Sequence, residues 1–196
     1  QFMGTREQPV LKRCGDDVRI NWGYAYLAIP AGTDAITAPG ASDIRRKIAQ
    51  GYPMPVVCEM AMPRKVSDGL PVMAACIDYG TVGIQVQTRY VVLSYDDILS
   101  VEYLGKKLKG YWARNGKSID TAIMEAIQEY TDLMVKCHEF DIELIKEAEI
   151  SGGDRYADIL ALAYRQSIAA HKLVADENGE ILFFSKECFS NGCMGT

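Results

Sequence analysis

The apolar and polar positions of the chain change their spacing about halfway along it. In the first half, residues 18–28 and 82–92 alternate apolar with polar or small side chains, which is the two-residue period of half-buried strands. Two short apolar runs, 56–62 and 72–79, are bounded by Pro and Gly and indicate strands in a sheet core. We therefore expect residues 1–93 to form the end of an antiparallel β-sandwich domain.

From Ser94 onward the apolar residues recur with a helical period. We expect a first helix from there to about Asn115, a second helix capped by Ser118, and a third over residues 139–150. Helices joined by short links pack as antiparallel neighbours. Residues 94–196 are therefore expected to form α-hairpins, and the whole chain an α+β fold.

The last quarter of the chain contains the densest apolar pattern. Asp154 is expected to cap a fourth helix that continues to about Val174, and its apolar side chains occupy nearly every side of the helix. Such a helix is typically buried. Asn178-Gly179 is a two-residue turn signal, and residues 180–185 are expected to form the returning strand.

Net charge and composition narrow the classes of partner. The chain carries a formal net charge of −5, and residues 96–196 hold 11 basic and 18 acidic groups. An acidic second half argues against nucleic acid as a partner. The basic cluster at 106–109 is interpreted as a solvated face, and no apolar run reaches the length of about 18 residues that spans a membrane.

Six cysteines and two histidines are scattered without a Cys-x-x-Cys pair, which argues against a zinc site. We expect no metal and no cofactor. Cys188 and Cys193 are close enough in sequence to form a disulfide in an oxidising compartment, although buried thiols are the preferred interpretation. His171 is interpreted as a hydrogen-bonded core residue in preference to a general base.

Four stretches together resemble the glutaminase A family. The main ones are YADILALAYRQSIAAHKLVAD (156–176) and FFSKECFSNGCMGT (183–196). LSYDDILSVEYLGKKL (93–108) is a further match, and GDDVRINWGY (15–24) is a weaker one. The resemblance implies a β-sandwich portion over residues 1–93, followed over 94–196 by the first α-hairpins of an incomplete six-hairpin (α/α) toroid.

The same resemblance implies a secreted, periplasmic or cell-envelope amidohydrolase that converts glutamine to glutamate and ammonia. In that family the chain continues through the rest of the toroid, so we expect this sequence to be a fragment and inactive by itself. The substrate would be a small molecule or a glycan. Two alternatives stay open: a six-hairpin glycoside hydrolase, and a non-catalytic carbohydrate-binding or structural envelope protein.

Hydrolysis of an amide or a glycoside needs one group that activates water and another that protonates the leaving group, and paired carboxylates serve both roles. The candidate catalytic residues are Asp96 and Asp97, at the junction of the two halves, and Glu187, in the C-terminal loop. The structural alternative is that an aspartate caps the first helix. Likewise, Glu187 could pair with Lys186 or Arg165.

The candidate substrate-binding residues are Tyr95, Arg165, Ser190 and Asn191. Tyr95 could line a pocket, and Ser190 and Asn191 could hold a polar substrate through their hydroxyl and amide groups. A tight Asn-Gly turn explains the last two residues equally well.

Overall fold

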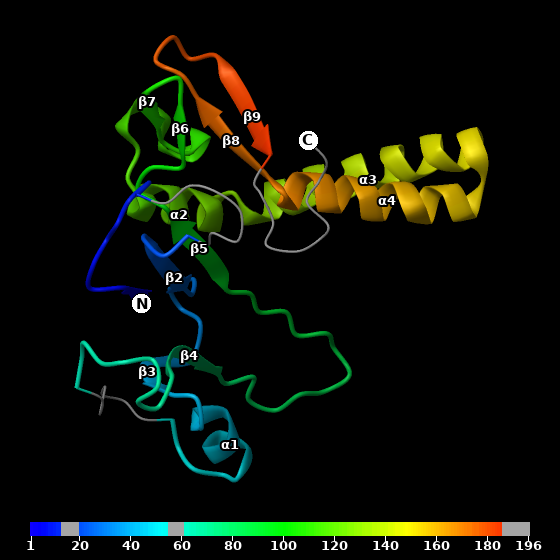
Figure 1. Ribbon diagram of the computed structural model, residues 1–196. Helices are drawn as coiled ribbons and strands as arrows, with labels where there is room; N and C mark the ends of the chain where they lie inside the picture. The colour runs from blue at the N-terminus through cyan, green and yellow to red at the C-terminus, as the bar shows by residue number, and fades with distance from the viewer. Residues whose placement is uncertain (13–19, 55–60, 186–196) are drawn as a thin grey trace. The chain divides into compact units, whose positions relative to one another are not determined.

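The computed structural model describes residues 1–12, 20–54 and 61–185. Antiparallel sheets occupy the N-terminal part and helices follow, so the predicted α+β class is confirmed (Figure 1). The chain divides into two compact units. One comprises Gln1–Gln8 and Gly23–Asp96, and the other comprises Pro9–Trp22 and Asp97–Thr196.

A three-stranded antiparallel sheet lies in the first unit. Its strands are β1 (Phe2–Gly4), β2 (Tyr24–Ala28) and β5 (Val92–Asp96), in the order β1-β2-β5. Leu27, on the central strand, is buried. In the register of the sheet, Tyr24 lies opposite Asp96, which places the end of β5 beside the start of β2.

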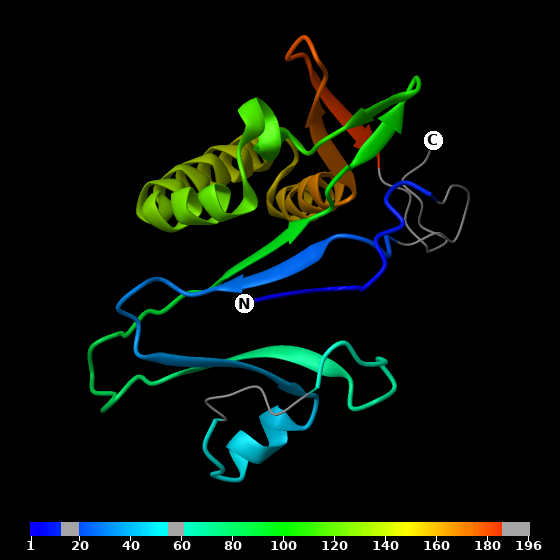
Figure 2. The same cartoon turned by 90° about the vertical axis from the view of Figure 1, so that its left-hand side faces the viewer.

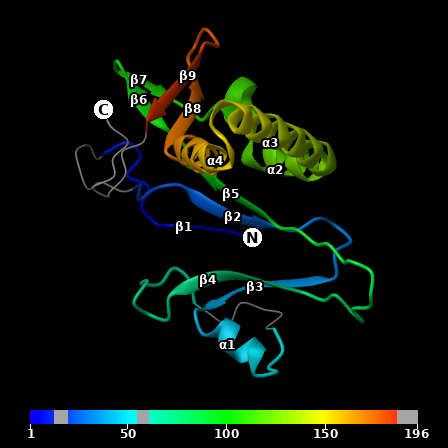
Figure 3. The same cartoon turned by 90° about the vertical axis from the view of Figure 1, so that its right-hand side faces the viewer.

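A second pair of strands completes the first unit. β3 (Ala35–Ala41) and β4 (Pro71–Ile77) are antiparallel, and helix α1 (Ile44–Ala49) lies beside them (Figures 2 and 3). A small core forms where these elements meet, from the buried Ala38, Ile44 and Met54. Burial of such apolar side chains is the main stabilising contribution here.

The predicted strand over residues 82–92 is wrong for most of its length. Only Val92 belongs to a strand, and residues 78–91 form a long connection between β4 and β5 (Figure 1). Val82, Ile84 and Val86 on this connection are exposed. An alternating apolar and polar pattern indicates which side chains would share a face of a strand. A strand also needs a neighbouring backbone that pairs with its N–H and C=O groups.

The predicted helix from Ser94 to Asn115 is also wrong. After β5 the chain forms β6 (Val101–Tyr103), β7 (Lys106–Leu108) and a 3₁₀ helix, η1 (Tyr111–Gly116). Leu104 and Gly105 link the two strands with φ of 49° and 77°. Positive φ at both central residues produces a tight hairpin turn and is incompatible with a continuing α-helix.

Three helices follow, and Ser118 begins the first of them as predicted. Its Oγ accepts a hydrogen bond from the backbone N–H of Thr121 at 3.2 Å, at the start of α2 (Ile119–Gln128). The expected third helix is part of a longer one, α3 (Tyr130–Gly152). The antiparallel α4 (Asp154–Ala169) lies beside α3 (Figures 1 and 3).

Two predictions about α4 are wrong. Gly153, at φ 80°, is the residue before the helix, and Asp154 is its first helical residue rather than its cap. Exposed apolar residues lie along α4, including Ile159, Leu162 and Ile168, while Ala157 is buried. An apolar pattern on every side therefore does not bury α4 within the described part of this chain.

The C-terminal hairpin is confirmed, with one change of boundary. The fourth helix ends at Ala169, and the residues that follow form β8 (His171–Ala175) rather than continuing the helix to Val174. β8 pairs with β9 (Ile181–Ser185) across the predicted Asn178-Gly179 turn. Among the described residues, no helix is both long enough and apolar enough to cross a membrane.

Candidate functional site

Asp96 and Asp97 are adjacent in sequence but lie in different environments. Asp96 ends β5 in the first unit, where it is half-buried and lies opposite Tyr24. Asp97 begins the connection to β6 in the second unit and is 2% exposed. No helix begins at either residue, so the alternative of a helix cap is wrong.

The side chain of Asp97 is part of a buried polar cluster. One carboxylate oxygen accepts a hydrogen bond from Ser100 Oγ at 2.8 Å, and the other lies 2.7 Å from Lys172 Nζ on β8. The backbone carbonyl of Asp97 accepts a hydrogen bond from Trp22 Nε1 at 2.7 Å. Both carboxylate oxygens are thus engaged, which favours a structural role over the activation of water.

The other candidates are distributed over the chain. Tyr95 lies on β5 in the first unit, and Arg165 is exposed on α4 in the second. Among the described residues Arg165 makes no ion pair. Glu187, Ser190 and Asn191 lie outside the described residues, as do Cys188 and Cys193. Their predicted roles stay predictions.

His171 lies at the first position of β8, where it is half-buried. Its ring stacks on Phe183 with centroids 4.5 Å apart and an interplanar angle of 11°. Nδ1 lies 2.5 Å from the backbone carbonyl of Ser167. A carbonyl oxygen only accepts hydrogen bonds, so Nδ1 must carry the proton. The expected hydrogen bond is therefore confirmed, whereas the expected place in the core of a helix is wrong, since His171 is half-buried on a strand.

A polar cavity of about 450 Å³, missed by the sequence reasoning, lies in the second unit. One wall is the segment from Lys109 to Asn115, and the other is the β8–β9 turn from Ala175 to Gly179. The antiparallel bridge between Gly110 and Val174 joins the two walls. The sequence offers little signal for this cavity, since its walls lie far apart along the chain.

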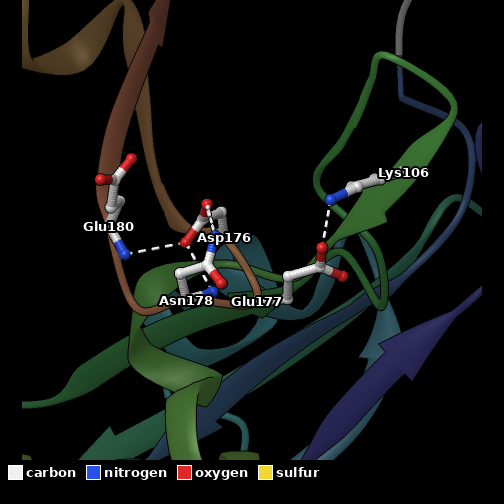
Figure 4. Close-up of polar contacts among 5 residues, drawn as sticks. All are labelled: Lys106, Asp176, Glu177, Asn178 and Glu180. Atoms are coloured by element: carbon white, nitrogen blue, oxygen red, sulfur yellow. Dashed lines mark hydrogen bonds and ion pairs between the residues drawn. The ribbon is translucent and has the colours of Figure 1, made fainter.

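Hydrogen bonds hold the acidic side of this cavity in place (Figure 4). Asp176 Oδ1 accepts from the backbone N–H groups of Asn178 and Glu180, each at 2.8 Å. The bond from Glu180, followed by those from Asn178, lowers the pKa of Asp176 from its ordinary value. Glu177 pairs with Lys106, and this hydrogen bond and the opposite charge raise the lysine pKa.

The basic side of the cavity comes from η1 and from Lys109, two residues before it. The Arg114 guanidinium lies 4.0 Å from the centroid of the Tyr111 ring and donates to the Tyr111 carbonyl at 3.1 Å. Lys109 supplies a second cation. No group of three His, Cys, Asp or Glu side chains in the described ranges is arranged to hold a metal ion.

Comparison with known proteins adds the family. An α+β protein with antiparallel strands leading into a helical hairpin is the class that the structure defines. Residues 2–147, most of the chain, match the family described as Domain of unknown function (DUF5127), and the chain belongs to this family. Residues 153–196 match the Glutaminase A six helical-hairpin domain. Curated proteins and solved structures gave no match.

Proposed function

We propose that this chain is part of a glutaminase A-like amidohydrolase that acts outside the cytoplasm. The observation that carries the proposal is the match of residues 153–196 to the Glutaminase A six helical-hairpin domain. The proposed reaction is L-glutamine and water giving L-glutamate and ammonia. We also propose that the helices of this chain belong to a six-hairpin (α/α) toroid, as the description of the matched domain implies.

Within this proposal Glu187 is the carboxylate that activates water, because it lies in the matched segment. It accepts a proton as the water oxygen attacks the carboxamide carbon. The second carboxylic acid of the pair donates a proton to the amide nitrogen, and the C–N bond of the tetrahedral intermediate then breaks to give ammonia and the new carboxyl group. Ser190 and Asn191 are proposed to hold the carboxamide through their polar side chains.

The second carboxylate of the pair is proposed to be Asp96 or Asp97. The buried contacts of Asp97 with Lys172 and Ser100 favour Asp96, since a proton donor must be able to reach the leaving group. Tyr95 and Arg165 keep their proposed roles in substrate binding.

The test is ammonia release from L-glutamine by the longest natural form of the protein that carries this sequence. Removing a general base typically lowers the rate by about 10²–10⁴-fold. Glu187→Gln should lower the rate to that extent, and Asp96→Asn should lower it too. Glu180→Gln is the matched control, because Glu180 contacts Asp176 through its backbone N–H, which the substitution keeps.

Two outcomes contradict the proposal. An unchanged rate in Glu187→Gln would remove this residue from the reaction. Absence of ammonia release, together with release of reducing sugar from a glycan, would replace the amidohydrolase with the glycoside hydrolase. Folding of each variant is checked by circular dichroism, so that loss of structure is not taken for loss of chemistry.

A further inference from the structure

The cavity between the Lys109–Asn115 segment and the β8–β9 turn has walls that the fold keeps in place. Val174 is fully buried and is bridged to Gly110. Gly110 has no side chain, and a Cβ there would lie 2.8 Å from Trp112 Nε1. Since such a contact is too close, glycine is the residue that lets Trp112 pack against the backbone of its own segment, while Lys172 Cε of β8 would lie 3.4 Å from the same Cβ.

The turn supplies fixed negative charge to this cavity. Asp176 Oδ1 accepts from two backbone N–H groups, Oδ2 accepts from the Asn178 side-chain amide at 3.2 Å, and a carboxyl group whose pKa lies below 3.8 is ionised near neutral pH. Glu177 lies beside it, paired with Lys106 (Figure 4). The acidic wall would therefore attract an ammonium group and repel a simple anion such as phosphate.

The opposite wall supplies positive charge with unused donors. Arg114 is positioned by its stacking on Tyr111 and by one hydrogen bond, which leaves most of the five guanidinium N–H groups available. Lys109 makes no ion pair or hydrogen bond with any described residue. A guanidinium group binds a carboxylate through two parallel hydrogen bonds.

We propose that this cavity binds a small zwitterion, a free amino acid, with its carboxylate on Arg114 and Lys109 and its ammonium on Asp176. The Tyr111 ring and the buried Ala113 offer apolar contact to the side chain of the ligand. Asp96, Asp97, Tyr95 and Arg165, the residues of the proposed hydrolysis that the structure describes, do not line the cavity. Only the choice of L-glutamine as a probe rests on the proposed function.

The experiment is isothermal titration of this chain with L-glutamine, repeated with the monoamide of glutaric acid and with D-glucose. The monoamide lacks the ammonium group and glucose lacks both charges. Hydrogen bonds to charged groups are strong enough that loss of one weakens binding by at least about tenfold. L-Glutamine is therefore expected to bind at least tenfold more tightly than either comparator.

Arg114→Gln should weaken L-glutamine binding by at least about tenfold, because the charged partner of the carboxylate is removed. Arg89→Gln is the matched control, since Arg89 also lies over a tyrosine ring, that of Tyr79 at 5.6 Å, but in the other unit. Lys109→Met serves as a second variant in case Arg114→Gln disturbs η1.

Equal affinity for glutamine and its monoamide would overturn the proposal, as would unchanged binding in both Arg114→Gln and Lys109→Met. Preferential binding of glucose would make the cavity a sugar site and would also overturn it. Ammonia release by the longer protein is measured separately, so failure of the proposed reaction leaves this binding test intact.

Discussion

The contact between Asp97 and Lys172 offers the sharpest test of how the second unit is held together. Asp97 is 2% exposed, and Lys172→Met would leave its carboxylate with Ser100 as the remaining side-chain partner among the described residues. At an effective dielectric constant of about 20, two charges about 4 Å apart attract by about 4 kcal/mol. Removing one partner of a buried pair costs about 3–5 kcal/mol.

We expect Lys172→Met to lower the free energy of unfolding by about 3 kcal/mol, near the lower end of that range, because the lysine side chain is still 17% exposed. The measurement is the free energy of unfolding from urea titration of this chain. Lys106→Met is the control, since its ion pair with Glu177 is solvent-exposed and should not change the unfolding midpoint measurably.

The double variant Asp97→Asn, Lys172→Met adds an internal check. It removes both charges together. Its decrease in the free energy of unfolding should therefore be smaller, by about 1 kcal/mol or more, than the summed decreases of the two single variants. If Lys172→Met unfolds at the same midpoint as Lys106→Met, or if the two single costs simply add, the buried pair does not stabilise the unit and the reasoning is wrong.

Three further predictions follow from local structure. Ser118→Ala should lower the free energy of unfolding by about 1 kcal/mol in urea titration, because the cap to the Thr121 N–H is lost. Gly153→Ala should cost about 1–3 kcal/mol in the same assay, since φ of 80° with ψ of 177° is open essentially to glycine alone. The lowered pKa of Asp176 means that its contribution to the β8–β9 hairpin is complete above the ordinary value of 3.8 and is lost as pH falls through the lower, folded value. The amide resonances of Asn178 and Glu180 should report this loss in an NMR titration.

Each of these predictions has a result that contradicts it. A Ser118→Ala variant as stable as the parent would remove the cap from the account of α2. An unchanged free energy of unfolding in Gly153→Ala would contradict the predicted backbone strain. A Cβ at this position would meet open space, so new contacts could not have compensated for the strain. An Asp176→Asn variant with the same titration as the parent would assign the pH response to another group.

The structural features that could be predicted from the sequence are those that depend on residues close together along the chain. The Ser118 cap and the Asn178-Gly179 turn each depend on residues within three or four positions, and both are confirmed. The helix expected from Ser94 failed because a strand, a tight turn and a second strand produced a similar apolar spacing. The turn depends on the positive φ of Leu104, which its side chain does not signal.

Contacts between distant parts of the chain were not predictable from spacing. The partner of Asp97 is Lys172, which the sequence places on an expected helix and the structure places on β8. The same holds for the cavity walls, since Arg114 and Asp176 line one cavity where the bridge between Gly110 and Val174 joins their segments. Both depend on how segments far apart in the sequence pack together, which the spacing of residues along the chain does not encode.

The candidate carboxylates show how adjacency in sequence differs from pairing in space. Asp96 and Asp97 are candidates because of their place at the expected junction of the two halves, yet β5 ends between them and they lie in different units. The contacts of Asp97 predict that removing its charge destabilises the second unit. Loss of turnover in Asp97→Asn is therefore evidence for catalysis only if that variant keeps the parent's free energy of unfolding.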